Sequence, residues 1–431
     1  MFIIAAPPAG APKPETNGMK PTSRTVVIGV MVRRRTPALG SSAEHVRTRI
    51  EHVMPNDHDI SEAPNGARAN ADLVRKGDEF EEQLYEVTDG VYVLVGVGIA
   101  NATMILGETG MIIVDTGESV EQAARHLQCF RRVTDRPVSA VVYSHSHYVH
   151  GTRAYVPTGE ESEVEIWGSQ RLDSNYRRAA FSPLSPIENT QAAIQVGLLL
   201  PTEGPDAVPN LGVGPYFGNL DKSAKRTNGY LRPNRTVPEE ASVDAVVDGV
   251  RIRFIPGYSD EDDSISLWLP DRAVAVTNIV WTSFPNVSPL RGGRYRDPLR
   301  WLESIDRIRH LEPQHLVMTH GRPISGQSVV AGCVRDYRDA LQYAYDQTIR
   351  GINQGLGPER LARTVKLPAP LAESRLTGQF YGEVAHHVRG IYAGLRGWWG
   401  LETAELEAID SAFEGERIVA GFGGAEALLA E

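Results

Sequence analysis

The sequence predicts an α/β fold: an αββα sandwich followed by an all-α domain. Between residues 83 and 143 the chain has the pattern of strands, a helix and a further strand, and strands resume from residue 244. Beyond residue 326, apolar residues recur with the period of an α-helix. We therefore divide the chain into a disordered segment 1–74, rich in Pro, Gly, Ala and Ser, a sandwich domain 75–327 and a helical domain 328–431.

The first half of the sandwich begins with an expected β-hairpin. Gln83 to Val97 roughly alternates polar and apolar residues around the turn Asp89-Gly90. Two further strands, a helix and a buried strand are then predicted at Asn101–Leu106, Met111–Val114, Glu118–Arg132 and Val138–Tyr143.

The second half resumes after a long segment, 183–234, that is dense in Pro and Gly. That segment is too long for a simple connection, so we expect it to cover or line the functional site. The elements predicted after it are strands Val250–Ile255, Ile265–Leu269, Ala273–Thr277 and His315–Thr319, and helices Pro298–His310, Val334–Gly351 and Gly382–Trp399.

Composition narrows the functional classes. The net charge of −10 and the pI near 5.7 argue against nucleic acid or an anionic membrane as the main partner. Cys129 and Cys333 lie outside any C-x-x-C pattern, which argues against a disulfide framework. The apolar runs are too short to span a membrane. We expect a cytoplasmic protein, and a targeting segment within the first 40 residues stays open.

The most informative segment is S-A-V-V-Y-S-H-S-H-Y-V-H-G, residues 139–151. His145 and His147 alternate with Ser146 as the chain leaves the strand, so an extended segment would place both rings on one side. A turn would bring His150 back to the same point. Three imidazoles and an open water position are typical of a hydrolytic metal site. The alternative is a polar loop without a ligand role.

A fourth histidine follows the strand 315–319. His320 lies directly before Gly321, at the end of that strand. This position would complete a metal site formed at the strand ends. A histidine before glycine is also common in loops that bind nothing.

The histidine segment resembles the H-x-H-x-D-H signature of the metallo-β-lactamase superfamily, with Val149 at the aspartate position. Other stretches resemble the alkylsulfatase branch of that superfamily, and they lie at Gly96 to Ile105, Gly110 to Thr116, Ser283 to Asp297, Thr319 to Gly326 and Phe380 to Trp399. The resemblance implies a metallo-β-lactamase sandwich, a helical dimerisation-type domain and a homodimer.

The resemblance also implies the metal ligands. It assigns His145, His147, His150 and His320 as ligands, with one carboxylate near Ser264, where a shifted Asp263 would substitute. The family's bridging carboxylate corresponds to Asn278. We regard Asn278 and Tyr148 as the catalytic candidates. Tyr148 would stack on substrate or donate a proton, and packing is an equal alternative.

The missing carboxylates favour one metal ion over two. Two dications about 4 Å apart need bridging anions to coexist. Four imidazoles with one carboxylate suit a single divalent ion, with zinc first and iron or manganese as alternatives. The substrate is expected to be a small molecule with an anionic group and an apolar part. The resemblance places its anion on Arg291, with Asn286 close by, since a guanidinium matches sulfate oxygens bidentately.

Three functions remain open. The first is a metal-dependent hydrolase of the alkylsulfatase type, in which metal-activated water attacks a sulfate or related ester. The second is a mononuclear metalloenzyme on the same fold with lyase, isomerase or redox chemistry in specialised metabolism. The third is a binding protein with a decayed site, which the four retained histidines disfavour.

Overall fold

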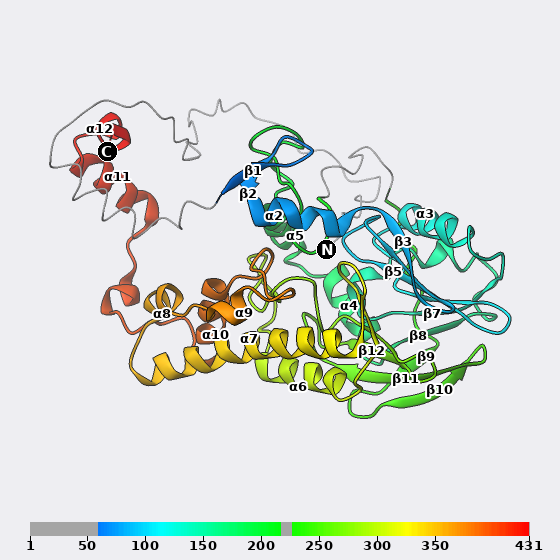
Figure 1. Cartoon of the computed structure of the whole chain (residues 1–431). Coiled ribbons are helices and arrows are strands. Elements are labelled where there is room, and N and C mark those ends of the chain that lie inside the picture. The colour runs from blue at the N-terminus through cyan, green and yellow to red at the C-terminus, as the bar shows by residue number, and fades with distance from the viewer. Residues whose placement is uncertain (1–58, 217–225, 431) are drawn as a thin grey trace.

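Two β-sheets pack face to face between layers of helices, as the sequence predicts (Figure 1). The computed structural model describes residues 59–216 and 226–430. Asp89-Gly90 forms the expected hairpin turn, with Gly90 at a φ of +69° that suits glycine.

The first sheet contains seven strands in sequence order. They are β3 (Gln83–Thr88), β4 (Val91–Val95), β5 (Ala102–Leu106), β6 (Met111–Val114), β7 (Val138–Val142), β8 (Glu165–Ser169) and β9 (Arg235–Val237). Strands β3 to β6 pair antiparallel and β6 to β9 pair parallel. The buried, Val- and Ile-rich β6 and β7 have the composition expected of central parallel strands.

The second sheet contains six strands, also in sequence order. They are β10 (Val243–Val247), β11 (Val250–Gly257), β12 (Ser264–Leu269), β13 (Val274–Thr277), β14 (His315–Met318) and β15 (Ile324–Ser325). Only the pair β13 and β14 is parallel within this sheet.

Apolar side chains fill the space between the sheets and under the helices. One cluster joins inward-facing residues of both sheets, including Val114, Phe254 and Leu267. A second lies under α3 (Val120–Phe130) and α4 (Leu172–Ala180), and a third under α6 (Pro298–Arg309) and α7 (Gln327–Asn353). Burying one such side chain contributes about 1.5–3 kcal/mol, so these layers hold the strand ends in place.

The helical part begins with α7 at Gln327 and packs beside α6 (Figure 1). It continues through α8 (Pro358–Thr364), α9 (Ala369–Ala372), α10 (Val384–Arg396), α11 (Ser411–Gly421) and α12 (Ala425–Ala430). Helices α11 and α12 extend away from the body and bury none of their residues. No described helix is long and apolar enough to cross a membrane.

The expectation of disorder through residue 74 is wrong for residues 59–74. They form β1 (Ile60–Glu62), β2 (Arg68–Asn70) and the start of α2 (Ala71–Lys76). The turn between the two strands is held because Asn65 donates to the carbonyls of Thr202 and Val208. The rest of the expected disordered segment lies outside the described residues. Within the expected lining segment 183–234, the chain forms α5 (Ser185–Gln195).

Candidate metal centre and substrate site

The polar side chains of the site come from strand ends and from the loop between β11 and β12. Asp115 follows β6, and Ser144 and His145 follow β7. Asn278 follows β13, and His320 comes soon after β14. The neighbouring strand ends of each sheet therefore bring residues far apart in the sequence to one edge of the sandwich.

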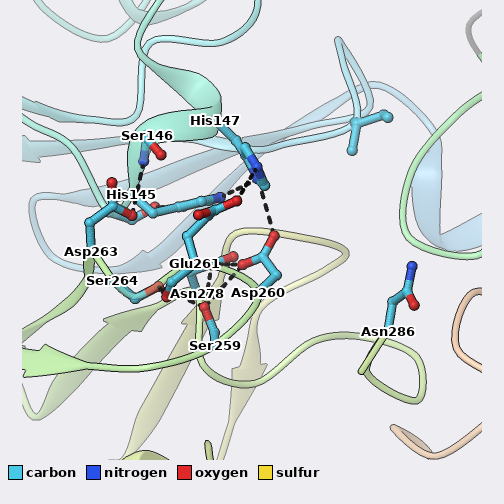
Figure 2. A network of polar contacts seen from close by, with 12 residues as sticks. His145, Ser146, His147, Ser259, Asp260, Glu261, Asp263, Ser264, Asn278 and Asn286 are labelled. Carbon is cyan, nitrogen blue, oxygen red and sulfur yellow. Dashed lines mark hydrogen bonds and ion pairs between the residues drawn. The ribbon is translucent and has the colours of Figure 1, made fainter. Parts of the chain in front are cut away.

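Two histidines and one carboxylate form a metal-ligand group. His145, His147 and Asp260 each offer a ligand atom, and these atoms lie within 4.8 Å of one another. Nε2 of His145 lies 3.2 Å from Nδ1 of His147, which lies 3.1 Å from Oδ2 of Asp260 (Figure 2). Among the described residues, no other such group of His, Cys, Asp and Glu occurs. Two imidazoles and a carboxylate suit zinc and other divalent metals.

The His145 ring is oriented by Ser144. Nδ1 of His145 lies 2.8 Å from the Ser144 hydroxyl, and that hydroxyl donates to Asp115 at 2.7 Å. A hydroxyl that donates to Asp115 accepts from Nδ1–H, which leaves the lone pair on Nε2 facing His147. Burial lowers the pKa of His145 to about 3, so the ring is neutral and able to bind a metal near pH 7.

Carboxyl groups orient the other ring. Nε2 of His147, the ring nitrogen that does not face Asp260, lies 3.3 Å from Oε1 of Glu261. A carboxylate that accepts the distal N–H of a ligating histidine fixes its tautomer and raises its basicity. Burial would raise the pKa of Asp260, but its interactions with His145, His147 and Arg296 hold that pKa well below the ordinary value.

The histidine segment is not extended as the alternation predicted. Residues Ser146–Tyr148 form a 3₁₀ turn, and the rings of His145 and His147 meet edge to face at 4.8 Å. The turn forms because the Tyr148 carbonyl accepts from the backbone N–H of Thr116 at 2.8 Å. Position 149 pairs with Gly117 in an isolated parallel bridge, which fixes the end of the turn.

Of the carboxylates in the acidic run 260–263, the structure brings Asp260 and not Asp263 to the two histidines. Asp263 is fully buried and accepts from the backbone N–H of Ser146 at 3.4 Å. Burial, followed by the nearby Glu261, raises the pKa of Asp263 well above its ordinary value. We therefore propose Asp260 as the carboxylate ligand, in place of the predicted Asp263.

His150 lies outside the ligand group. Its ring packs 5.8 Å from that of Tyr176, and its buried Nδ1 has no hydrogen-bond partner among the described residues. Val149 points into the cluster under α3, with no exposed surface. The chain therefore offers an apolar side chain where a second metal would need an anion.

His320 also lies outside the ligand group. Its Nδ1 lies 2.9 Å from the carbonyl of Ile99. The centroid of its ring lies 5.7 Å from that of Tyr148 and 5.5 Å from that of Trp281. The Tyr148 ring also packs against that of His145, with 5.1 Å between the ring centroids, so this tyrosine lies between the two buried histidines. The ligand roles of His150 and His320 and the catalytic role of Tyr148 stay predictions.

The predicted substrate residue Asn286 is linked to this centre through Arg296, which donates to its carbonyl and places positive charge near Asp260. Asn286 is buried and stands apart from the hydrogen-bonded network in Figure 2. It lines a cavity of about 380 Å³ together with Gln195, Leu211 and Tyr381. The Arg291 backbone N–H donates to Gln195 at 3.1 Å, so Arg291 lies at the border of the cavity. The cavity wall also contains apolar residues of α5 and the segment after it, including Ile194, Val196, Leu200 and Val208, and polar residues that include Asn210, Gln379, Glu383 and His386.

The sequence did not identify Asp260 and Glu261 as the carboxylates beside the histidines, and it did not show that Arg296 is buried near them. The acidic run was visible, but nothing in the sequence indicates which of its four carboxylates faces the histidines. Arg296 is buried, donates to the backbone carbonyl of Asn286, and places positive charge near Asp260. The only sequence signal for Arg296 was its position in the arginine-rich segment 291–296.

Two family models match the chain. Residues 95–150 match the metallo-beta-lactamase superfamily, and residues 358–431 match the alkyl sulfatase dimerisation family. The chain thus matches a metallo-β-lactamase model and an alkylsulfatase dimerisation model in this order, which confirms the predicted fold class and resemblance.

Curated relatives specify the resemblance further. The chain is 34% identical to a linear primary-alkylsulfatase of a Pseudomonas species over 333 residues, 76% of this chain and 61% of the relative. It is 28% identical to the alkyl/aryl-sulfatase BDS1 of Saccharomyces cerevisiae, across 80% of this chain and 54% of the relative. The chain spans about half to three fifths of the length of these relatives.

A solved structure shows the same fold. The stereoselective inverting sec-alkylsulfatase Pisa1 from Pseudomonas superposes with a TM-score of 0.77 at 24% identity. The match covers 86% of this chain and 58% of that one.

Proposed function

We propose that this chain is a metal-dependent hydrolase of sulfate or related esters, active as an alkylsulfatase-type enzyme. The observation that carries the proposal is the metal-ligand group of His145, His147 and Asp260. Arg296 links this group to Asn286, which lines the cavity. The alkylsulfatase relatives support the same reaction class.

The residues present fit one divalent metal ion better than two. The ionised Asp260 and Glu261 with the nearby Arg296 carry one net negative charge. Arg291 would offset the charge of a sulfate monoester monoanion, so one dication would leave a net charge of +1. A second dication would raise that charge to +3 inside the protein, which is costly at low dielectric. Zinc is the first candidate, with iron and manganese as alternatives.

The chain's own residues would bind and orient the ester. A bound divalent metal supplies a Lewis acid that polarises the ester and lowers the pKa of water. Arg291 would hold the sulfate oxygens bidentately, and Asn286 would donate from its side-chain amide. The apolar part of the substrate would occupy the cavity beneath α5, which excludes water from that part. Tyr148, between His145 and His320, would donate a proton or stack on the substrate.

A second candidate function is a mononuclear metalloenzyme with lyase, isomerase or redox chemistry. Two observations favour it over a dinuclear hydrolase. Val149 lies in the hydrophobic cluster, and Asn278 places a neutral amide against Asp260. Both positions therefore lack the anions that a second metal would require.

We further propose a homodimer formed through the C-terminal region. The dimerisation-family match covers α8 to α12. The segment 398–429 exposes large apolar side chains, namely Trp398, Trp399, Leu401, Leu406, Ile409, Phe413, Ile418, Phe422 and Leu429. A monomer rarely leaves so many exposed along one segment, whereas a partner subunit would cover them.

Metal content with turnover tests the proposed function. We would measure metal per chain by ICP mass spectrometry on aerobically and anaerobically purified protein, then assay a series of alkyl sulfates of increasing chain length. We expect one equivalent, lost in His145→Ala, and hydrolysis with a raised KM in Arg291→Ala. An Arg294→Ala variant is the control, because the Arg294 guanidinium is paired with Asp262. One equivalent of metal without hydrolysis of any ester would instead favour the second candidate, and absence of metal would contradict both.

A further inference from the structure

Asn278 holds Asp260 from the side opposite the histidines. The Asn278 side-chain amide donates from Nδ2 to Oδ1 of Asp260 at 2.9 Å and to the Ser259 hydroxyl at 3.0 Å (Figure 2). The other carboxylate oxygen, Oδ2, is the one that lies 3.1 Å from His147. The two oxygens of Asp260 thus have different partners: Oδ1 accepts from the Asn278 amide, and Oδ2 faces His147.

The orientation of the amide follows from charge. Only the NH₂ group of asparagine donates, and its carbonyl oxygen would repel an ionised carboxylate. Nδ2 therefore faces Asp260. The remaining Oδ1 of Asn278 is buried without a partner among the described residues. An unsatisfied buried acceptor costs about 1–3 kcal/mol, which a purely structural asparagine would be expected to avoid.

A second donor acts on the same oxygen. The Ser259 hydroxyl lies 3.0 Å from Oδ1 of Asp260 and 2.6 Å from the hydroxyl of Ser264. Since Ser259 donates to the carboxylate, it accepts from the Asn278 amide, and the Ser264 hydroxyl also has the Glu261 carbonyl as an acceptor at 3.2 Å. Asn278, Ser259 and Ser264 are almost completely buried, and the Asp260 side chain is 9% exposed. Water therefore has little access to the donors that hold Oδ1.

We propose that Asn278, assisted by Ser259, is a positioning residue that presents Oδ2 of Asp260 to a single divalent cation bound with His145 and His147. The inference rests on the metal centre of the proposed function. It explains why an amide suits position 278. A carboxylate there would face Asp260 at hydrogen-bond distance, and two like charges would turn Asp260 away from the histidines. Removal of such an outer partner typically weakens metal binding by about 10- to 100-fold.

The test is zinc affinity and stoichiometry in Asn278→Asp and Asn278→Leu. Affinity is measured by competition with a chromophoric chelator and stoichiometry by ICP mass spectrometry. Asn278→Asp keeps the shape but replaces the donor with an acceptor, and Asn278→Leu removes the donor without adding charge. We expect both variants to bind one equivalent about 10- to 100-fold more weakly than wild type, with the aspartate the weaker.

The matched control is Asn175→Asp. Asn175 is also buried and donates to a carboxylate of the same acidic run, Oδ1 of Asp262 at 2.6 Å, but Asp262 is outside the ligand group. Zinc affinity in this control is expected to stay within about threefold, which corresponds to roughly 0.65 kcal/mol. Circular dichroism of the metal-free proteins shows whether each variant folds, and Ser259→Ala, with the same expected weakening, replaces any Asn278 variant that does not.

The possible outcomes distinguish failure of the metal centre from failure of the positioning role of Asn278. Wild-type protein that binds none of zinc, iron and manganese contradicts the proposed metal centre itself. Wild-type protein that binds zinc, with wild-type affinity in Asn278→Asp and Asn278→Leu, overturns the positioning role alone. A second equivalent of zinc in Asn278→Asp would also overturn it, because the amide would then only have displaced a ligand.

Discussion

Ser144 donates both its backbone N–H and its hydroxyl to the carboxylate of Asp115, at 2.8 and 2.7 Å. Asp115 directly follows β6 and has a φ of +60°, a conformation that costs about 1–3 kcal/mol for a residue other than glycine. The same hydroxyl orients His145. The strained end of β6 is thus linked to the metal centre through one side chain.

Replacement of Ser144 by alanine should therefore act on stability and on metal binding together. Ser144→Ala leaves Asp115 with one donor fewer and His145 without an acceptor for Nδ1–H. We expect the free energy of unfolding to fall by about 1–3 kcal/mol and zinc affinity to fall about 10- to 100-fold. Denaturant unfolding of the metal-free protein and chelator competition measure the two effects separately. Unchanged zinc affinity would show that Ser144 does not orient the ring.

A pair of substitutions decides which acidic residue binds the metal. Asp260→Asn should abolish stoichiometric zinc binding, since Oδ2 of Asp260 is the carboxylate oxygen at the histidines. Asp263→Asn should retain one equivalent, because Asp263 faces the backbone of Ser146. ICP mass spectrometry after gel filtration measures both. The reverse pattern would restore our original expectation for Asp263.

Restoration of the family's aspartate should not create a second metal site. Val149→Asp would place a carboxylate in the hydrophobic cluster under α3, where no water compensates its charge. We expect a loss of at least about 3 kcal/mol of unfolding free energy, larger than that of Val149→Ala. Thermal and denaturant unfolding measure this difference. A stable Val149→Asp protein with two equivalents of zinc would contradict the prediction.

Buried His126 should make the protein sensitive to acid. Burial, followed by the charge of Arg125, lowers the pKa of His126 to about 3. In the unfolded chain a histidine titrates near its ordinary pKa, about 6.5, so between these values only the unfolded state binds the proton. His126 therefore lowers stability as pH falls from about 6.5 towards 3, by up to about 1.4 kcal/mol per pH unit.

Removal of His126 should make the free energy of unfolding depend less strongly on pH. His126→Leu should reduce the slope of unfolding free energy against pH, between about pH 4 and 6, by close to one proton. Wild-type protein, measured in parallel, provides the reference slope. Urea unfolding at a series of pH values gives both slopes. Equal slopes for wild type and His126→Leu would contradict the assignment.

The sequence by itself determined the order of strands and helices and the location of the histidines at a strand end. These features depend on local patterns: alternation in 83–97, the apolar run before His145, and helical periodicity after residue 326. Such patterns predict the observed elements because burial of one face of a strand or helix dictates which positions along the chain are apolar. They also sufficed to show that Val149 could not ligate a metal.

Only the tertiary structure decided which side chains meet. Asp260 rather than Asp263 reaches the histidines because the loop between β11 and β12 folds across the end of β7, and that arrangement depends on the packing of two sheets. The 3₁₀ turn at 146–148 likewise depends on a hydrogen bond from Thr116, 32 residues before Tyr148. Local preference cannot encode such contacts, because their free energy comes from partners that are distant in the sequence.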